Sequence, residues 1–348
     1  MKILFIVKGG KTPHSLSNSA IFTINYLKTL NVNTDIAFVT ESSQIENVIN
    51  DNAPTHVIIE SVFVMPIEFL RLTNMFKKVK WFIRLHSDIG FFFAEIYGME
   101  WLKAYQTFDD ITVAANNSEI IQNLSPLLQK DIVYLPNIYP DNFEYDNHVD
   151  RVKENKIIDI GCFGNLRLVK NQGFQAVLAM NFANILSKKL RFHINVGKSE
   201  LRNNAVLTNL RALFKDSGHE LVEHGWVPHD EFIQLVKTMD LGLQLSYTES
   251  FNIVACDFIA NGIPILVSDT ISWCLPNYKA STIDMNECLS KLNLLYDNRK
   301  NTDLNKLAIK NLMYVNNNAK LIWLKFIEEQ NPNKFNPLHR HNVNMHII

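Results

Sequence analysis

Cysteine is scarce in this chain of 348 residues, and the four that occur, Cys162, Cys256, Cys274 and Cys288, show no paired spacing. Such usage argues against a disulfide framework and predicts a reduced, cytoplasmic protein. No apolar run reaches the roughly 20 residues that a membrane-spanning helix needs, so stable membrane insertion is not expected. The apolar stretch 3–7 lacks a small-residue cleavage site, which favours a core strand over a signal peptide.

Two phosphate-binding motifs are also missing. Gly9 and Gly10 follow the first apolar stretch, but no Gly-Lys-Ser/Thr comes at P-loop spacing and no three-glycine dinucleotide fingerprint is present. The remaining functional interpretation is a glycine loop that lets a donor phosphate or an acceptor come close to the backbone.

Composition and charge are compatible with a large core and an anionic ligand. Hydrophobic residues make up 47% of the chain, and the length allows two domains of ordinary size. Residues 1–150 hold 11 Lys and Arg against 17 Asp and Glu, whereas the remainder holds 23 against 18. A basic second half suits a phosphate-bearing ligand, although drift of surface charge explains the difference equally well. The acidic first half argues against a broad contact with a nucleic-acid backbone.

Short apolar runs alternate with amphipathic stretches, and this alternation occurs twice. In the first half we expect strands at 2–8, 34–40, 55–61, 79–85, 110–115 and 132–136, and helices at 18–30, 43–51, 65–77, 92–106 and 118–128. In the second half we expect strands at 157–163, 191–196, 220–223, 241–245 and 264–267, and helices at 171–187, 201–216, 229–238, 251–261 and 286–297, before a last helix at about 303–327. The pattern predicts an α/β fold of two Rossmann-like domains whose parallel sheets bind ligands at the carboxyl ends of their strands.

A polar segment from Pro136 to Asn155 separates the two alternations and reads as a linker. We therefore expect a first domain at 1–148, a second at 149–325 and a tail at 326–348, for which packing back onto the first domain is one option. Three histidines, His339, His341 and His346, lie in this tail, and a disordered or lightly docked tail explains them better than a metal site.

The most informative segment runs from Ser246 to Pro264. It reads as a strand end, a loop, a helix and the next strand, with Ser250 as the expected N-cap. A helix N-terminus is a ready site for a diphosphate, and Ser250 and Asp257 lie seven residues apart on one helix face. Asp257 is therefore placed to bind the hydroxyls of a ribose, and Glu249, in the loop, lies nearer to a sugar. From spacing alone, a capping acid and a solvent-facing acid explain the pattern as well.

Two further segments carry candidate residues. Gly164, Arg167 and Lys170 follow a strand, where a small-residue turn allows close approach and two cations can neutralise a leaving diphosphate. His86 ends another strand and is placed to donate to a sugar hydroxyl or to contact the acceptor, although a lone histidine is more often structural.

Together these segments resemble the GT-B glycosyltransferases, and most closely glycosyltransferase family four. Gly225-Trp226-Val227-Pro228, a helix, a strand, Ser246-x-x-Glu249-x-Phe251-Asn252 and Gly262-x-Pro264 follow the order and spacing of that family over about forty residues. The segment from Gly164 to Lys170 matches the family's Gly-Arg-Leu-x-x-x-Lys. The resemblance covers the second domain, and in the first domain mainly the first strand, the glycine loop and His86.

The resemblance implies a role for each matching residue. Lys170 would bind the donor diphosphate, Glu249 the transferred sugar, Asp257 the ribose and His86 the sugar from across the cleft. The backbone amides of Phe251, Asn252 and Ile253 would contact phosphate and sugar. Three positions depart from the family: Asn165 replaces an arginine, for which Arg167 is a substitute, Asn252 replaces a glycine, and Asp257 is one methylene shorter than the family's glutamate.

The resemblance also implies a retaining reaction that requires no cofactor and no metal. No Asp-x-Asp lies on a suitable loop, which agrees with metal independence, and the implied donor is a UDP-sugar. The whole chain is similar to glycosyltransferases of large tailed phages in Lys80–Ser87, Met99–Leu102, Gly161–Gly164 and Thr248–Asn252. That similarity implies action in a host cytoplasm on a hydroxymethylated pyrimidine of phage DNA, such as hydroxymethylcytosine.

The acceptor has competing interpretations. A base in a duplex must be flipped out, and Phe91, Phe92, Phe93, Tyr97 and Trp101 offer stacking near His86, although at helical spacing such aromatics are more often core. A bacterial surface glycan or lipid is the alternative acceptor, with the stretch 65–80 a modest amphipathic match. A non-catalytic sugar- or nucleic-acid-binding module is a second alternative, against which Lys170, Glu249 and Asp257 count. The sequence does not indicate an oligomeric state.

Overall fold

The computed structural model describes residues 1–9, 15–141, 143, 156–197, 204–299 and 302–331. The predicted tail histidines and Gly10 lie outside these ranges. The first half is built on a six-stranded parallel sheet with the strand order β2-β1-β3-β4-β5-β6. Its strands are β1 Lys2–Lys8, β2 Asn33–Val39, β3 His56–Glu60, β4 Lys80–Leu85, β5 Ile111–Ala115 and β6 Val133–Tyr134. Its helices are α1 Ser15–Thr29, α2 Ile45–Asn52, α3 Pro66–Met75, α4 Ile89–Phe92, α5 Gly98–Tyr105 and α6 Ser118–Leu128.

The second half repeats this architecture with the strand order β12-β11-β10-β7-β8-β9, again all parallel. Its strands are β7 Ile157–Gly161, β8 Lys189–Asn195, β9 Glu220–His224, β10 Leu241–Gln244, β11 Ile265–Ser268 and β12 Lys279–Ala280. Its helices are α7 Gln172–Ile185, α8 Ala205–Phe214, α9 His229–Val236, α10 Ile253–Ala260, α11 Met285–Asp297 and α12 Thr302–Gln330. The predicted α/β class with two parallel sheets is confirmed.

The strands are continuous apolar runs because helices cover both faces of each sheet. Ile3 to Val7 in β1 are fully buried, and so are Leu241 and Leu243 in β10. Gly242 in β10 permits close packing, since a Cβ there would come within 2.7 Å of the Phe258 ring on α10. This contact draws α10, and the loop before it, against the carboxyl end of the second sheet.

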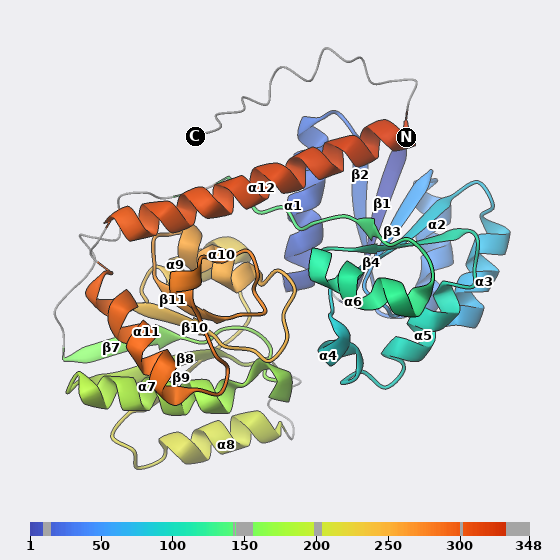
Figure 1. Cartoon of the computed structure of the whole chain (residues 1–348). Coiled ribbons are helices and arrows are strands. Elements are labelled where there is room, and N and C mark those ends of the chain that lie inside the picture. Colours follow the sequence, from blue (N-terminus) through green and yellow to red (C-terminus); the bar gives the residue numbers. More distant parts are fainter. Residues whose placement is uncertain (10–14, 142, 144–155, 198–203, 300–301, 332–348) are drawn as a thin grey trace.

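α12 crosses from one half to the other (Figure 1). Ala308, Ile309 and Leu312 belong to the core of the second half, whereas Trp323 and Phe326 belong to that of the first half. The predicted boundary at 325 therefore falls inside a helix that continues to Gln330. The Trp323 indole also donates to the Pro136 carbonyl at 2.8 Å, which ties the helix to the chain crossing between the halves.

Two helix predictions need correction. The stretch 92–106 was expected to be one helix, but α4 ends at Phe92 and α5 begins at Gly98. A Cβ at Gly98 would lie 3.0 Å from the Phe92 ring, so the two helices meet through a residue without a side chain. The second correction concerns α10, which begins at Ile253 and not at 251. The two-residue strand β12 was not predicted.

Candidate active site

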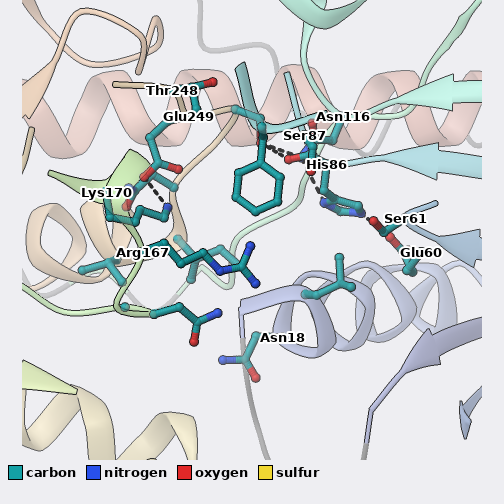
Figure 2. A pocket seen from close by; sticks show the side chains of 18 of the residues that line it. Asn18, Glu60, Ser61, His86, Ser87, Asn116, Arg167, Lys170, Thr248 and Glu249 are labelled. Carbon is teal, nitrogen blue, oxygen red and sulfur yellow. Dashed lines mark hydrogen bonds and ion pairs between the residues drawn. The ribbon is translucent and has the colours of Figure 1, made fainter. Parts of the chain in front are cut away.

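A cavity of about 800 Å³ lies between the halves and is lined by residues of both. The carboxyl ends of β1, β3 and β4 supply one wall, and the loops that follow β7 and β10 supply the other. Figure 2 shows Lys170 and Glu249 on one side of this cavity, Glu60 and His86 on the other, and Arg167 between them. The fold thus brings together side chains that lie up to 189 positions apart in the sequence.

Lys170 and Glu249 form an ion pair on the wall of the second half. The Lys170 ammonium donates to Glu249 Oε1 at 2.5 Å, and the Ser246 hydroxyl donates to the same oxygen at 2.8 Å. Glu249 is 8% exposed and Lys170 is 23% exposed, so both reach the cavity from a sheltered position. This arrangement fixes one cation and one carboxylate within reach of the same ligand.

His86 is held by a buried network in the first half. Its Nε2 hydrogen-bonds to Glu60, and the Asn116 amide donates to its Nδ1 at 3.1 Å. Burial lowers the pKa of His86, and Glu60 only partly offsets this, so the imidazole is neutral at pH 7. Because both ring nitrogens have partners, a hydrogen bond from His86 to a sugar hydroxyl requires one of these contacts to change.

Glu60 and Arg84 complete this network. Arg84 is fully buried, pairs with Glu60 at 3.0 Å and donates to the carbonyls of Leu135 at 2.7 Å and Pro136 at 2.9 Å. Burial raises the pKa of Glu60, but the charge of Arg84 and the contact with His86 outweigh it, and the pKa lies below its usual value. Glu60 is therefore an ionised carboxylate whose oxygens already accept from Arg84 and His86.

Ser250 joins the two halves and does not cap a helix, contrary to the prediction from sequence. Its hydroxyl donates to the His86 carbonyl at 3.0 Å and accepts from the Asn116 amide at 3.2 Å. The Asn117 amide donates to the Ser250 carbonyl at 2.7 Å. The loop with the candidate catalytic Glu249 is thus fastened directly to the segment that carries His86.

Asn252 is the N-cap of α10. Its backbone is left-handed, with φ 60°, a conformation that favours glycine or asparagine. Its side chain accepts from the Ala255 amide at 2.8 Å and donates to Gln244 at 2.9 Å. The departure from the family's glycine therefore keeps the backbone conformation and adds a cap. The first amides of α10, including that of Ile253, have no partner within the helix and line the cavity wall.

Asp257 lines the same cavity but is only 1% exposed. Its Oδ1 accepts from the Tyr139 hydroxyl at 2.8 Å and from His229 Nε2 at 2.7 Å. Burial raises the pKa of Asp257, although hydrogen bonds from His229 and Tyr139 oppose the shift. Burial lowers the pKa of His229, but the hydrogen bond to Asp257 and its charge outweigh this and raise it above the usual value. These contacts fix the carboxylate at the cavity edge.

Gly164 and Arg167 occupy the turn after β7. Gly164 has φ +116°, and a Cβ there would meet no atom within 4 Å, so the backbone lies open to the cavity. The Arg167 guanidinium lies 4.8 Å from the centre of the Phe91 ring and 3.6 Å from Glu95, both in the first half. Arg167 therefore reaches across the cavity, whereas Asn165 lines it from its own side.

Two predicted donor contacts lie elsewhere. Gly9 has φ 133° and donates from its amide to Val39 at 2.8 Å, but it does not line the cavity. The Phe251 side chain lies against Trp273, and Phe251 lines a separate cavity of about 530 Å³ and not the one between Lys170 and His86.

Sequence reasoning did not single out several residues of the site. Glu60, Asn116, Tyr139 and His229 all hold a predicted site residue in place. Each lies at least 26 positions in the sequence from the predicted site residue that it contacts. Glu60 and Asn116 stand at the carboxyl ends of predicted strands, and this position is the signal that could have identified them.

Solved structures with similar folds cover almost the whole chain. A sucrose-phosphate synthase from Thermosynechococcus elongatus aligns with a TM-score of 0.72 and 11% identity, over 95% of this chain and 99% of the other. A glycosyltransferase from Rickettsia africae aligns at 0.67 with 12% identity, over 95% and 99%. The chain has the GT-B fold. A UDP-forming trehalose-phosphate synthase from Burkholderia xenovorans shares this GT-B architecture at 0.64 with 9% identity, over 93% and 98%.

Sequence comparison adds no closer relative, since no family model and no curated protein matches the chain. In the described part of this GT-B structure, no helix is long and apolar enough to cross a membrane. Within the same residues, no three or more His, Cys, Asp or Glu side chains are grouped to hold a metal ion.

Proposed function

We propose that the chain is a glycosyltransferase that moves a sugar from a nucleotide-sugar donor to a hydroxyl acceptor, with retention of configuration and without a metal ion. The observation that carries this proposal is the Lys170–Glu249 pair facing the His86 network across one cavity of the GT-B fold. A cation beside a carboxylate suits a ligand with both a diphosphate and a hydroxyl-rich sugar.

The donor lies along the wall of the second half. Its diphosphate binds the Lys170 ammonium, with the open backbone at Gly164, the Arg167 guanidinium and the first amides of α10 around it. Asp257 binds the ribose, and Glu249 binds hydroxyls of the sugar. The donor nucleotide is UDP, which is supported by the UDP-forming enzyme among the structures with this fold.

The chemistry follows from which carboxylates are free. The bond between the sugar's anomeric carbon and the diphosphate breaks, the acceptor oxygen bonds to that carbon on the same face, and the acceptor proton passes to the departing phosphate. On the wall of the first half, Glu60 is paired with Arg84, and Asp88 accepts from the Ile89 amide and from Asn123. Glu95, the third carboxylate of this wall, lies 3.6 Å from Arg167. Each of the three therefore has a partner in the described structure, which supports retention without an enzymic nucleophile on the opposite face.

The acceptor is a hydroxymethylated pyrimidine in DNA. Aromatic residues on the first-half wall support this acceptor, because Phe91, Tyr97 and Trp101 line the cavity and the last two rings stack 5.7 Å apart. Within the predicted aromatic set, Phe92 is buried in the first-half core and Trp101 packs against that core, whereas Phe93 is 77% exposed. A flat, partly exposed aromatic wall suits a base that has been flipped from its duplex.

A donor and acceptor panel tests this function. The protein is incubated with UDP-, GDP- and ADP-sugars and with DNA containing hydroxymethylcytosine or unmodified cytosine, and nucleosides are then analysed by mass spectrometry. We expect a hexose or pentose mass on hydroxymethylcytosine alone, from a UDP-sugar, with a rate that EDTA does not change. If nucleotide is released while the DNA gains no sugar, the transferase assignment stands and the DNA acceptor is rejected. A strict metal requirement would reject the proposed mechanism.

Asp257→Asn is expected to raise the donor KM about tenfold and to leave kcat within about twofold, because the lost charge weakens the hydrogen bonds to the ribose. Steady-state kinetics with the active UDP-sugar measure both constants. Asp269→Asn, an exposed aspartate outside the cavity, is the control. A fall in kcat with an unchanged donor KM would place Asp257 in the chemical step.

A further inference from the structure

Lys8 differs from the other basic side chains that line the cavity. Arg167 has Glu95, Lys170 has Glu249, His86 has Glu60 and His229 has Asp257 as a carboxylate partner. In the described ranges Lys8 has no carboxylate within 4 Å, and its ammonium lies 6.0 Å from the centre of the Phe63 ring. An ammonium group at a ligand cavity without a protein counter-ion favours a ligand that supplies the negative charge.

Neighbouring groups add hydrogen-bond donors beside Lys8. Val7 and Glu60 are partners in the parallel register of β1 and β3, so Lys8 and Ser61 follow side by side at the carboxyl ends of these strands. Ser61 lines the cavity with φ 83°, a strained conformation for serine that the hydrogen bond from its amide to the Arg84 carbonyl holds in place. Strain of this kind is characteristic of ligand sites.

The first turn of α1 lines the same cavity. Leu16 and Asn18, in its first turn, both line the cavity, and this turn contains no acidic residue. A helix N-terminus carries partial positive charge, which an anion can neutralise. In Figure 2, Asn18 and Ser61 lie apart from the Lys170–Glu249 pair. The nearby Glu60 does not oppose an anion, because Arg84 neutralises it in the protein interior.

We propose that Lys8, Asn18 and Ser61 form an acceptor subsite for a phosphate group. The ammonium, the amide and the hydroxyl belong to three separate elements, and a tetrahedral anion can accept from all three. This inference rests on the proposed function in one respect: it takes the ligand on the first-half wall to be the acceptor of the transferred sugar. The acceptor therefore carries a phosphate ester, either a phosphomonoester on a small molecule or a phosphodiester of a nucleic acid.

Binding of inorganic phosphate tests the subsite without turnover. Phosphate is titrated by calorimetry into the full-length protein after UDP has saturated the proposed donor site. Millimolar or tighter binding is expected, which weakens at least tenfold in Lys8→Gln and is retained in Lys8→Arg. Lys78→Gln, an exposed lysine of the same half outside the cavity, is the matched control and is expected to bind as wild type does. Absence of phosphate binding, or equal binding by Lys8→Gln, would overturn the proposal.

Transfer assays then identify the source of the phosphate. Glucose is compared with glucose 6-phosphate, and the hydroxymethylcytosine nucleoside with its 5′-monophosphate and with an oligonucleotide. We expect the phosphorylated member to have at least a tenfold lower acceptor KM, and Lys8→Gln to remove that difference. Equal acceptor KM values for the phosphorylated and unphosphorylated compounds would reject the phosphate subsite but leave the transferase assignment intact. If Lys8→Gln loses phosphate binding but the wild-type protein releases no nucleotide from any donor, the anion site stands and the transferase assignment is rejected.

Discussion

Glu249→Gln is expected to lower kcat/KM for the proposed sugar transfer on the order of a thousandfold, because one carboxylate would perform two tasks. Glu249 binds the sugar in the proposed reaction, and its Oε1 also fixes the Lys170 ammonium beside the leaving diphosphate. An amide of the same size carries no charge, so it weakens both contacts while the packing of the loop is preserved. Product formation and nucleotide release measure the loss.

The control for this variant is Glu100→Gln, an exposed glutamate on α5 that does not line the cavity. It is expected to be fully active. Thermal melts of the two variants are expected to agree with wild type, which separates loss of chemistry from loss of fold. Retention of more than a tenth of the activity in Glu249→Gln would show that another residue holds the sugar.

Arg84→Met is expected to lower the free energy of unfolding by about 3–5 kcal/mol, because removal of one member of a buried ion pair leaves the other charge buried without a partner. Arg84 is fully buried, and its loss leaves Glu60 without its cation and the Leu135 carbonyl without the Arg84 donor, whereas the Pro136 carbonyl keeps its hydrogen bond from Trp323. Urea denaturation followed by fluorescence measures the change. Such a loss is a large part of the total stability of an ordinary domain.

Arg71→Met is the matched control, because Arg71 pairs with Glu46 and Glu68 on the surface and is expected to matter little. The double variant Glu60→Gln with Arg84→Met is expected to recover part of the stability, as no buried charge is left alone. Since the folded-state pKa of Glu60 lies below its usual value, its contribution is present at neutral pH and is lost as the pH falls through that pKa. An Arg84→Met midpoint equal to that of Arg71→Met would contradict this account.

Local patterns were sufficient to predict the fold. The alternation of apolar strands with amphipathic helices is written in consecutive residues, and each expected strand has a counterpart in the two sheets. The break between α4 and α5 was missed because it depends on Gly98 packing against Phe92, a contact that hydrophobic periodicity does not report. Ser250 was assigned as a cap on spacing, but the left-handed backbone of Asn252 moved the cap two residues on.

The candidate residues on the second-half wall lie on short segments with characteristic spacing, which is why the sequence singles them out. Lys170 and Glu249 were predicted as site residues from two such segments, and the structure joins them directly. The contacts of His86 with Glu60 and Asn116, and those of Asp257 with Tyr139 and His229, depend on how separate segments meet. Residue spacing in a single sequence does not show which distant segments meet. The networks that set these protonation states could therefore be identified only in the folded structure.

The helix α12 has a consequence for the order in which this protein folds during synthesis. Trp323, Phe326 and Ile327 fill the core beneath the first sheet, although that sheet is complete by Tyr134. The ribosome must therefore make almost 190 further residues before the first half can close over its apolar interior. Until then the rings of Phe5 and Phe82 lack the α12 side chains that cover them, and chaperones that recognise apolar surface would bind there.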